Sequence, residues 1–130
     1  MSTAILSPSA PAPIGPYSQA VSAGGWVFLS GQIPLVPATG QLAGTDIASQ
    51  TRQVLSNLRE VLGASGLEPR HVVRTTIYLA DLSHFAIVNE LYAQFLVGVP
   101  VPPARSTVQV SALPKGALVE IDAIAVRDAK

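Results

Sequence analysis

The chain has 130 residues, enough for one domain with its own core, and its formal net charge is zero. Neutrality and an aromatic content of only 5% argue against a nucleic-acid-binding protein, which needs a basic face and usually stacking rings. Charged residues make up only 12%, so we expect other subunits to cover part of the surface of this small domain.

The composition also narrows the chemistry and the compartment. The absence of cysteine excludes disulfides, thiolate metal sites and cysteine nucleophiles. No apolar run is long enough to span a membrane. The Ser-, Ala- and Pro-rich residues 1–13 lack the basic start and apolar block of a secretory signal. We therefore expect a cytoplasmic protein with a single domain over residues 1–130.

The first half of the chain predicts an extended arm, two strands and a helix, over residues 1–16, 19–22, 26–33 and about 46–64. Three prolines forbid helix within the arm. The segment 26–33 is rich in aromatic and aliphatic residues, which is typical of a strand. In the helix, apolar residues recur at helical spacing, and Thr45 or Asp46 can cap its start.

The second half predicts a strand, a helix and two final strands, over residues 72–79, roughly 84–96, 105–110 and 117–126. Steps of three, four and three place a buried stripe on the helix, formed by Phe85, Val88, Tyr92 and Phe95. Asn89 lies at the edge of that inward face. The turn residues 113–116 predict a hairpin between the last two strands.

The order β-β-α-β-α-β-β predicts an α+β fold, with a mixed, mainly antiparallel sheet and two helices on one face. The other face of the sheet then needs a cover, and with so few charges available we expect that cover to be another subunit.

Arg105 and Glu120 are the main candidate site residues because each is a charge in a stretch that should be buried, where it is costly unless paired or used. A guanidinium on rigid structure suits a planar carboxylate, and a nearby carboxylate can move protons or aim a water. Alternatively, Arg105 forms a structural salt bridge, or Glu120 pairs with Lys115 or Arg127. Whether the two share a face depends on the hairpin register, and otherwise they can meet only across a subunit boundary or round an edge.

Three further residues are candidates. Ser30 and Gly31 lie at the end of a predicted strand, where they either terminate it or bring a hydroxyl and backbone N–H groups to a ligand. Tyr17 either anchors the arm or reaches into a pocket. The two histidines have no partners at metal-ligand spacing, so we expect no metal site.

Several segments, in combination and order, resemble the Rid family (reactive intermediate deaminases), specifically its RidA-type enamine/imine deaminases. The resemblance begins at Ala12 and rests on IGPYSQA at 14–20, SGQIP at 30–34, PARST at 103–107, VSALPKG at 110–116 and VEIDAIA at 119–125. It implies a chorismate-mutase-like fold, a homotrimer with clefts between its subunits, and hydrolysis of 2-aminoacrylate and related 2-imino acids to 2-keto acids and ammonia without a cofactor.

The resemblance also implies roles for individual residues. Arg105 would hold the substrate carboxylate, Glu120 would orient or deprotonate a water, and Tyr17 would order the reacting groups. The substrate-binding set would be Ser30, Gly31, Asn89, Arg105 and Thr107. Many members have cysteine where this chain has Thr107, and we expect the activity to survive this departure. Two other functions remain open, namely a non-catalytic trimer that binds 2-keto acids and an RNase or translation inhibitor.

Overall fold

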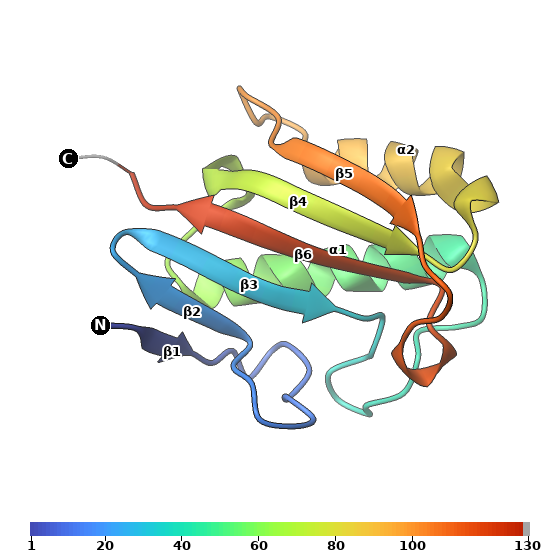
Figure 1. Cartoon of the computed structure of the whole chain (residues 1–130), viewed down its shortest axis with the longest axis horizontal. Coiled ribbons are helices and arrows are strands. Elements are labelled where there is room, and N and C mark those ends of the chain that lie inside the picture. Colours follow the sequence, from blue (N-terminus) through green and yellow to red (C-terminus); the bar gives the residue numbers. More distant parts are fainter. Residues whose placement is uncertain (129–130) are drawn as a thin grey trace.

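The computed structural model describes residues 1–128, which form one six-stranded sheet with two long helices packed on the same face (Figure 1). The strands are β1 (Thr3–Ile5), β2 (Ala20–Ala23), β3 (Trp26–Gln32), β4 (Val72–Leu79), β5 (Ala104–Gln109) and β6 (Val119–Val126). The helices are α1 (Ile47–Ala64) and α2 (Phe85–Phe95), with short 3-10 turns at Pro69–His71, Leu82–His84 and Pro114–Gly116. The predicted α+β fold with a mixed sheet is confirmed.

The strand order in the sheet is β1-β2-β3-β6-β4-β5. All neighbouring pairs are antiparallel except β4 and β5, which run parallel. A parallel pair needs a crossover, and α2 supplies it between the end of β4 and the start of β5. The last strand, β6, inserts between β3 and β4 and so lies in the middle of the sheet.

The core lies between the sheet and the helices, because every second residue of the central strands points toward α1 and α2. In β6 the odd-numbered residues from Val119 to Ala125 are buried, while the even-numbered ones are only half-buried. Helix α1 begins where predicted, since the Asp46 carboxylate accepts a hydrogen bond from Ser49 N–H at 2.9 Å. Its buried residues, including Val54, Leu58 and Val61, keep helical spacing.

The predicted hairpin between the last two strands is wrong. β5 pairs only with β4, at the edge of the sheet, and β6 does not touch it as a sheet neighbour. The physical reason is the βαβ unit formed by β4, α2 and β5, whose crossover places β5 beside β4 and leaves β6 to fill the gap on the other side. The segment between β5 and β6 is a loop containing a 3-10 turn.

The extended arm contains one strand that was not predicted, β1, which pairs with β2 at the edge of the sheet. One expectation about the second helix also differs from the structure. Phe85, predicted in the buried stripe of the second helix, is 38% exposed, whereas Val88, Tyr92 and Phe95 are buried as expected. Phe85 is the first residue of α2, close to the edge strand β5, where less of the structure covers it.

The face of the sheet opposite the helices carries apolar side chains that remain exposed. Trp26 and Phe28 stack with ring centroids 6.4 Å apart, and each is nearly half exposed. Val108 is also exposed. It lies on the same face as Tyr78 and Glu120, because Val108 pairs in register with Tyr78 and Tyr78 pairs with Glu120. We call this surface the open face. Within residues 1–128 no helix is both long and apolar enough to cross a membrane.

Candidate functional site

Glu120 lines a cavity on the open face, at the end of the sheet where β3 leaves β6. The cavity has a volume of about 580 Å³ and is lined by Ile14, Tyr17, Ser30, Gly31, Ile33, Pro114, Lys115 and Glu120. Four predicted site residues, Tyr17, Ser30, Gly31 and Glu120, therefore come together. They come from the N-terminal arm, β3 and β6, so the fold and not the local sequence unites them. We call this space the Glu120 cavity.

Gly31 makes room for the Glu120 side chain. A β-carbon built on Gly31 would overlap the Glu120 carboxylate and its neighbouring side-chain carbons. The backbone of Gly31 does not have a positive φ, so conformation alone does not require glycine at this position. The register between β3 and β6 shifts between Leu29 and Gln32, and this irregularity positions Gly31 against Glu120.

The Glu120 carboxylate is half-buried, and burial raises its pKa above the ordinary glutamate value, with a further contribution from the charge of Asp122. Asp122 follows two residues later on the same face of β6, and its carboxylate accepts a hydrogen bond from the Tyr78 hydroxyl at 3.0 Å. A carboxylate with a raised pKa is a stronger base, which suits a group that must take a proton from water near neutral pH.

Tyr17 and Ser30 reach the Glu120 cavity in different ways. Tyr17 is 52% exposed, and its hydroxyl accepts a long hydrogen bond of 3.4 Å from Ile14 N–H. The Ser30 hydroxyl donates to the Ser18 carbonyl at 2.6 Å, so its hydrogen is already engaged and its oxygen can act toward a ligand as an acceptor. Both groups lie beside Glu120 without bonding to it.

The segment between β1 and β2, which carries Tyr17, is held in place by Gln19. The Gln19 side chain is buried, accepts a hydrogen bond from Ser7 N–H at 2.6 Å and donates one to the Pro11 carbonyl at 2.8 Å. Such a buried amide fixes the loop before it, and therefore fixes the wall of the Glu120 cavity.

Sequence reasoning missed Lys115 as a site residue. Lys115 lines the mouth of the Glu120 cavity and has a φ of 59°, which is left-handed and uncommon for a residue with a side chain. The Pro-Lys-Gly turn between the last two strands was the available signal. Sequence reasoning treated it as a hairpin turn and as part of a motif of the resemblance, with Lys115 as a possible ion-pair partner of Glu120. The sequence does not show which cavity the turn would border.

Arg105 lines a second cavity, on the helix side of the sheet. This cavity has a volume of about 530 Å³ and is lined by Asn89, Tyr92, Ala93, Leu96, Pro102, Pro103 and Arg105. We call it the Arg105 cavity. Its walls come from α2 and from the loop before β5, which contributes Pro102 and Pro103.

The Arg105 guanidinium is held by α2. One of its nitrogens donates to the Asn89 side-chain oxygen at 2.7 Å, and its carbon lies 5.1 Å from the Tyr92 ring centroid and 5.5 Å from that of Phe85. No carboxylate within residues 1–128 forms an ion pair with it, which removes the structural salt bridge as an account of this arginine there. The remaining N–H groups can therefore bind a planar acid.

Thr107 lies two residues after Arg105 on the same face of β5, since Arg105 pairs with Thr75 and Thr107 with Ile77. Its hydroxyl is buried and finds no hydrogen-bond partner in the described part of the chain. A buried hydroxyl without a hydrogen-bond partner costs free energy, so a ligand with a donor or acceptor near the Thr107 hydroxyl would be favoured.

The two cavities lie on opposite faces of one sheet. Arg105 pairs with Thr75 and shares the helix side, whereas Glu120 pairs with Tyr78 and shares the open face. Within one chain, Arg105 and Glu120 therefore cannot contact the same small ligand. The register does not bring the two side chains to one face, so they can meet only across a subunit boundary or round an edge of the sheet. Among residues 1–128, no three His, Cys, Asp or Glu side chains gather as a metal site would require.

The role of Gly31 can be tested by adding one methyl group. We expect Gly31→Ala to displace the Glu120 carboxylate and to lower the free energy of unfolding by about 1–3 kcal/mol, because the new β-carbon has no space. Gly63→Ala is the matched control, since nothing lies near its added β-carbon and alanine favours helix. Denaturant melts and a crystal structure of each variant check this. An unmoved Glu120 in a fully stable Gly31→Ala protein would contradict it.

Comparison with known proteins places the chain in a family. The model of the family described as Endoribonuclease L-PSP matches residues 7–127. Protein DfrA of Myxococcus xanthus is 59% identical over 95% of this chain and 94% of its own length. The 2-iminobutanoate/2-iminopropanoate deaminase of Mus musculus is 46% identical over 95% of this chain and 90% of its own.

A solved structure matches as well. YyfA from Yersinia pestis, a protein of the conserved Rid family, is 48% identical, and its TM-score is 0.94 over 97% of this chain and 99% of the other. The resemblance found in the sequence is therefore confirmed at the level of the family and the fold. Like the Rid proteins that it resembles, this chain belongs to the Endoribonuclease L-PSP family.

Proposed function

We propose that this protein hydrolyses reactive 2-imino acids, such as the imine form of 2-aminoacrylate, to 2-keto acids and ammonia in clefts between the subunits of a homotrimer. One observation carries the proposal: a group suited to hold a carboxylate and a group suited to activate water line separate cavities on opposite faces of the sheet. Each cavity supplies what the other lacks, so two subunits brought together complete one site.

The Arg105 cavity supplies the carboxylate clamp. The guanidinium is already oriented by Asn89 and by the ring of Tyr92, so little conformational entropy is lost when it grips a substrate. Each charge-assisted hydrogen bond to a carboxylate is worth about 1.5–3 kcal/mol, and a planar acid can accept two of them in parallel. The guanidinium thus recognises the carboxylate, which all 2-imino acids share.

The Glu120 cavity supplies the hydrolytic chemistry. The carbon of a protonated imine next to a carboxylate is electrophilic, so a water oxygen can bond to it while Glu120 takes one proton from that water. Glu120 then returns this proton to the nitrogen. As the carbon–nitrogen bond breaks, Glu120 takes the proton of the remaining hydroxyl, so that the carbonyl of the 2-keto acid forms and ammonia leaves. Ammonia takes the proton from Glu120, so one protonated imine and one water give one 2-keto acid and one ammonium. No cofactor is needed in this scheme.

The open face supports the assembly that the scheme needs. Trp26, Phe28 and Val108 expose large apolar side chains on one surface, and a surface of this kind favours contact with another subunit. The mouse relative's name, 2-iminobutanoate/2-iminopropanoate deaminase, supports the reaction class. The number of three subunits rests on the resemblance to the Rid family.

Arg105→Ala tests the carboxylate clamp. We expect kcat/KM for imine hydrolysis to fall by at least about 10²-fold, because two charge-assisted hydrogen bonds are lost, and binding of pyruvate or 2-ketobutyrate to disappear. Arg105→Lys should recover little, since an ammonium cannot reproduce the two-pronged grip. The assay follows ammonia and 2-keto acid release from imine generated continuously by a dehydratase and serine.

The control for this experiment is Arg52→Ala, which removes an exposed arginine of α1 that lines neither cavity. Its activity and melting temperature should match those of the parent. A folded Arg105→Ala protein with full activity would sink the proposed mechanism. If the parent protein binds 2-keto acids but shows no turnover, and Arg105→Ala loses that binding, the protein is a non-catalytic 2-keto-acid binder instead.

The raised pKa of Glu120 predicts the pH dependence of the reaction. The base must be ionised, so the rate should rise with pH through a midpoint above the ordinary glutamate value of 4.5. Asp122→Asn should lower this midpoint, because the charge of Asp122 is the second cause of the shift, after burial. Glu120→Gln should lose about 10²–10⁴ in rate and the pH dependence with it. The profile is measured with the generating enzyme in excess and the uncatalysed rate subtracted.

The same shift has a consequence for stability, with a definite sign. A carboxyl group that binds its proton more tightly when folded makes the fold more stable at low pH, and this contribution is lost as pH rises through the raised pKa. Glu120→Gln should therefore be relatively more stable than the parent above that midpoint. If the pH–rate profile of the parent has its midpoint at or below 4.5, or if Glu120→Gln is active, then another group activates the water.

A further inference from the structure

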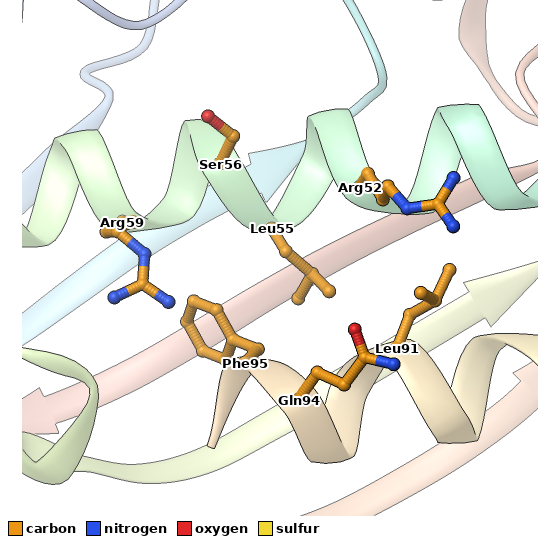
Figure 2. Close-up of a pocket in the computed structure, with 7 residues that line it drawn as sticks. All are labelled: Arg52, Leu55, Ser56, Arg59, Leu91, Gln94 and Phe95. Atoms are coloured by element: carbon orange, nitrogen blue, oxygen red, sulfur yellow. The ribbon is translucent and has the colours of Figure 1, made fainter. Parts of the chain in front are cut away.

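The groove between α1 and α2 contains two arginines that the proposed reaction does not use. Arg52 and Arg59 come from α1, and Leu91, Gln94 and Phe95 come from α2, with Leu55 in the floor between the helices (Figure 2). The groove has a volume of about 290 Å³. We call it the α1–α2 groove. It shares no lining residue with the Glu120 or Arg105 cavities.

The two arginines form a spaced pair. They are seven positions apart, which is close to two helical turns, so they lie on the same side of α1 with their backbones about 10.5 Å apart along the axis. The Arg59 guanidinium carbon lies 5.0 Å from the Phe95 ring centroid, and this contact orients it over the groove. Figure 2 shows the two guanidinium groups on either side of Leu55.

Both arginines lack a carboxylate partner in the described part of the chain. The ion pairs there involve only Arg70 and His71, with Glu68 and Asp128. The acids on the two helices, Glu60 of α1 and Glu90 of α2, do not line the groove. Hydrogen bonds from Ser49 and, more weakly, the charge of Arg52 lower the pKa of Asp46, which does not line the groove. Among the described residues, Arg52 and Arg59 are therefore the charged side chains that line the α1–α2 groove, and no acid lines it.

The shape of the groove favours an extended partner over an enclosed small molecule. A second hollow of about 210 Å³ shares Arg59, Gln94 and Phe95 with the first and continues to Val97, which is 83% exposed. Each hollow is smaller than the roughly 300–1,000 Å³ of a typical small-molecule pocket. Together they make an elongated, shallow track. Arg52 and Arg59 line its first part. Its second part is lined by Arg59, by Arg70 with its ion-pair partner Glu68, and by the apolar Val97.

We propose that the α1–α2 groove docks an acidic segment of a partner protein, with two carboxylates spaced to meet Arg52 and Arg59 and an apolar side chain placed against Phe95 and Val97. Arginine clusters commonly recognise acidic motifs, and their planar donors match carboxylates. A helix with glutamates seven positions apart has the required spacing of about 10.5 Å. This proposal does not rest on the deaminase activity, because the groove is separate from both cavities.

The test uses the full chain and a synthetic peptide as the probe. The peptide has blocked ends and a helix-forming sequence. It carries two glutamates seven positions apart, and one leucine on each side of the second glutamate. We expect saturable binding by calorimetry with a Kd below about 1 mM at low salt, weakening as salt rises. A peptide with both glutamates changed to glutamine should bind at least about fivefold more weakly, and this arm does not depend on how any variant folds.

Variants then place the contact. Arg52→Gln combined with Arg59→Gln should weaken binding of the glutamate peptide at least about fivefold, whereas Lys115→Gln, which removes a charge far from the groove, should not. Arg52→Glu combined with Arg59→Glu should bind a peptide that carries lysines in place of the two glutamates. Imine hydrolysis should be unchanged in the glutamine pair. Equal binding of the glutamate and glutamine peptides, or no binding at all, would overturn the proposal.

Discussion

The alternation of side chains along a β-strand is the constraint on which this protein's site depends. Arg105 on β5 and Glu120 on β6 are separated by β4, and the register across these three strands sends their side chains to opposite faces. A shift of one residue in either pairing would bring them to one face, but it would also turn the buried residues of that strand outward. The core therefore fixes the separation of the two charges.

This separation leaves each of the two charged groups, within one chain, without the counterpart that the proposed reaction needs. Arg105 is oriented by Asn89 and Tyr92 without an acid in contact, and Glu120 is packed against Gly31 with its carboxylate half-buried. The burial of the Glu120 carboxylate costs free energy in an isolated chain. A substrate held between two subunits would offset this cost, since it presents a carboxylate to one cavity and an imine carbon to the other.

Much of the fold could be predicted because local chemistry and tertiary structure agree. The spacing of apolar residues and the Asp46 cap locate α1, and the β-branched run locates β4. The pairing of β5 could not be predicted from the turn before β6, because pairing is decided by the crossover through α2 and not by the turn residues. The β4-α2-β5 alternation was the better signal, since it is typical of parallel strands.

The candidate site, like the fold, could be predicted only in part. The sequence singles out Arg105 and Glu120 as charges in apolar stretches, and both line cavities. It does not show that Gly31 makes room for Glu120, that Lys115 borders the same cavity, or that Phe85 lies exposed near the Arg105 guanidinium. These contacts join residues far apart in the chain, so only the three-dimensional structure reveals them.

Mixing two inactive variants tests the central claim most directly. If Arg105 of one subunit and Glu120 of another form each cleft, Arg105→Ala and Glu120→Gln proteins that are unfolded together and refolded should regain activity. With random assembly in a closed ring, about a quarter of the clefts would hold both intact residues, so about a quarter of the parent activity should return. Separate refolding of each variant is the control. A mixture as inactive as its components, although native mass spectrometry shows oligomers that contain both variants, would contradict the shared cleft.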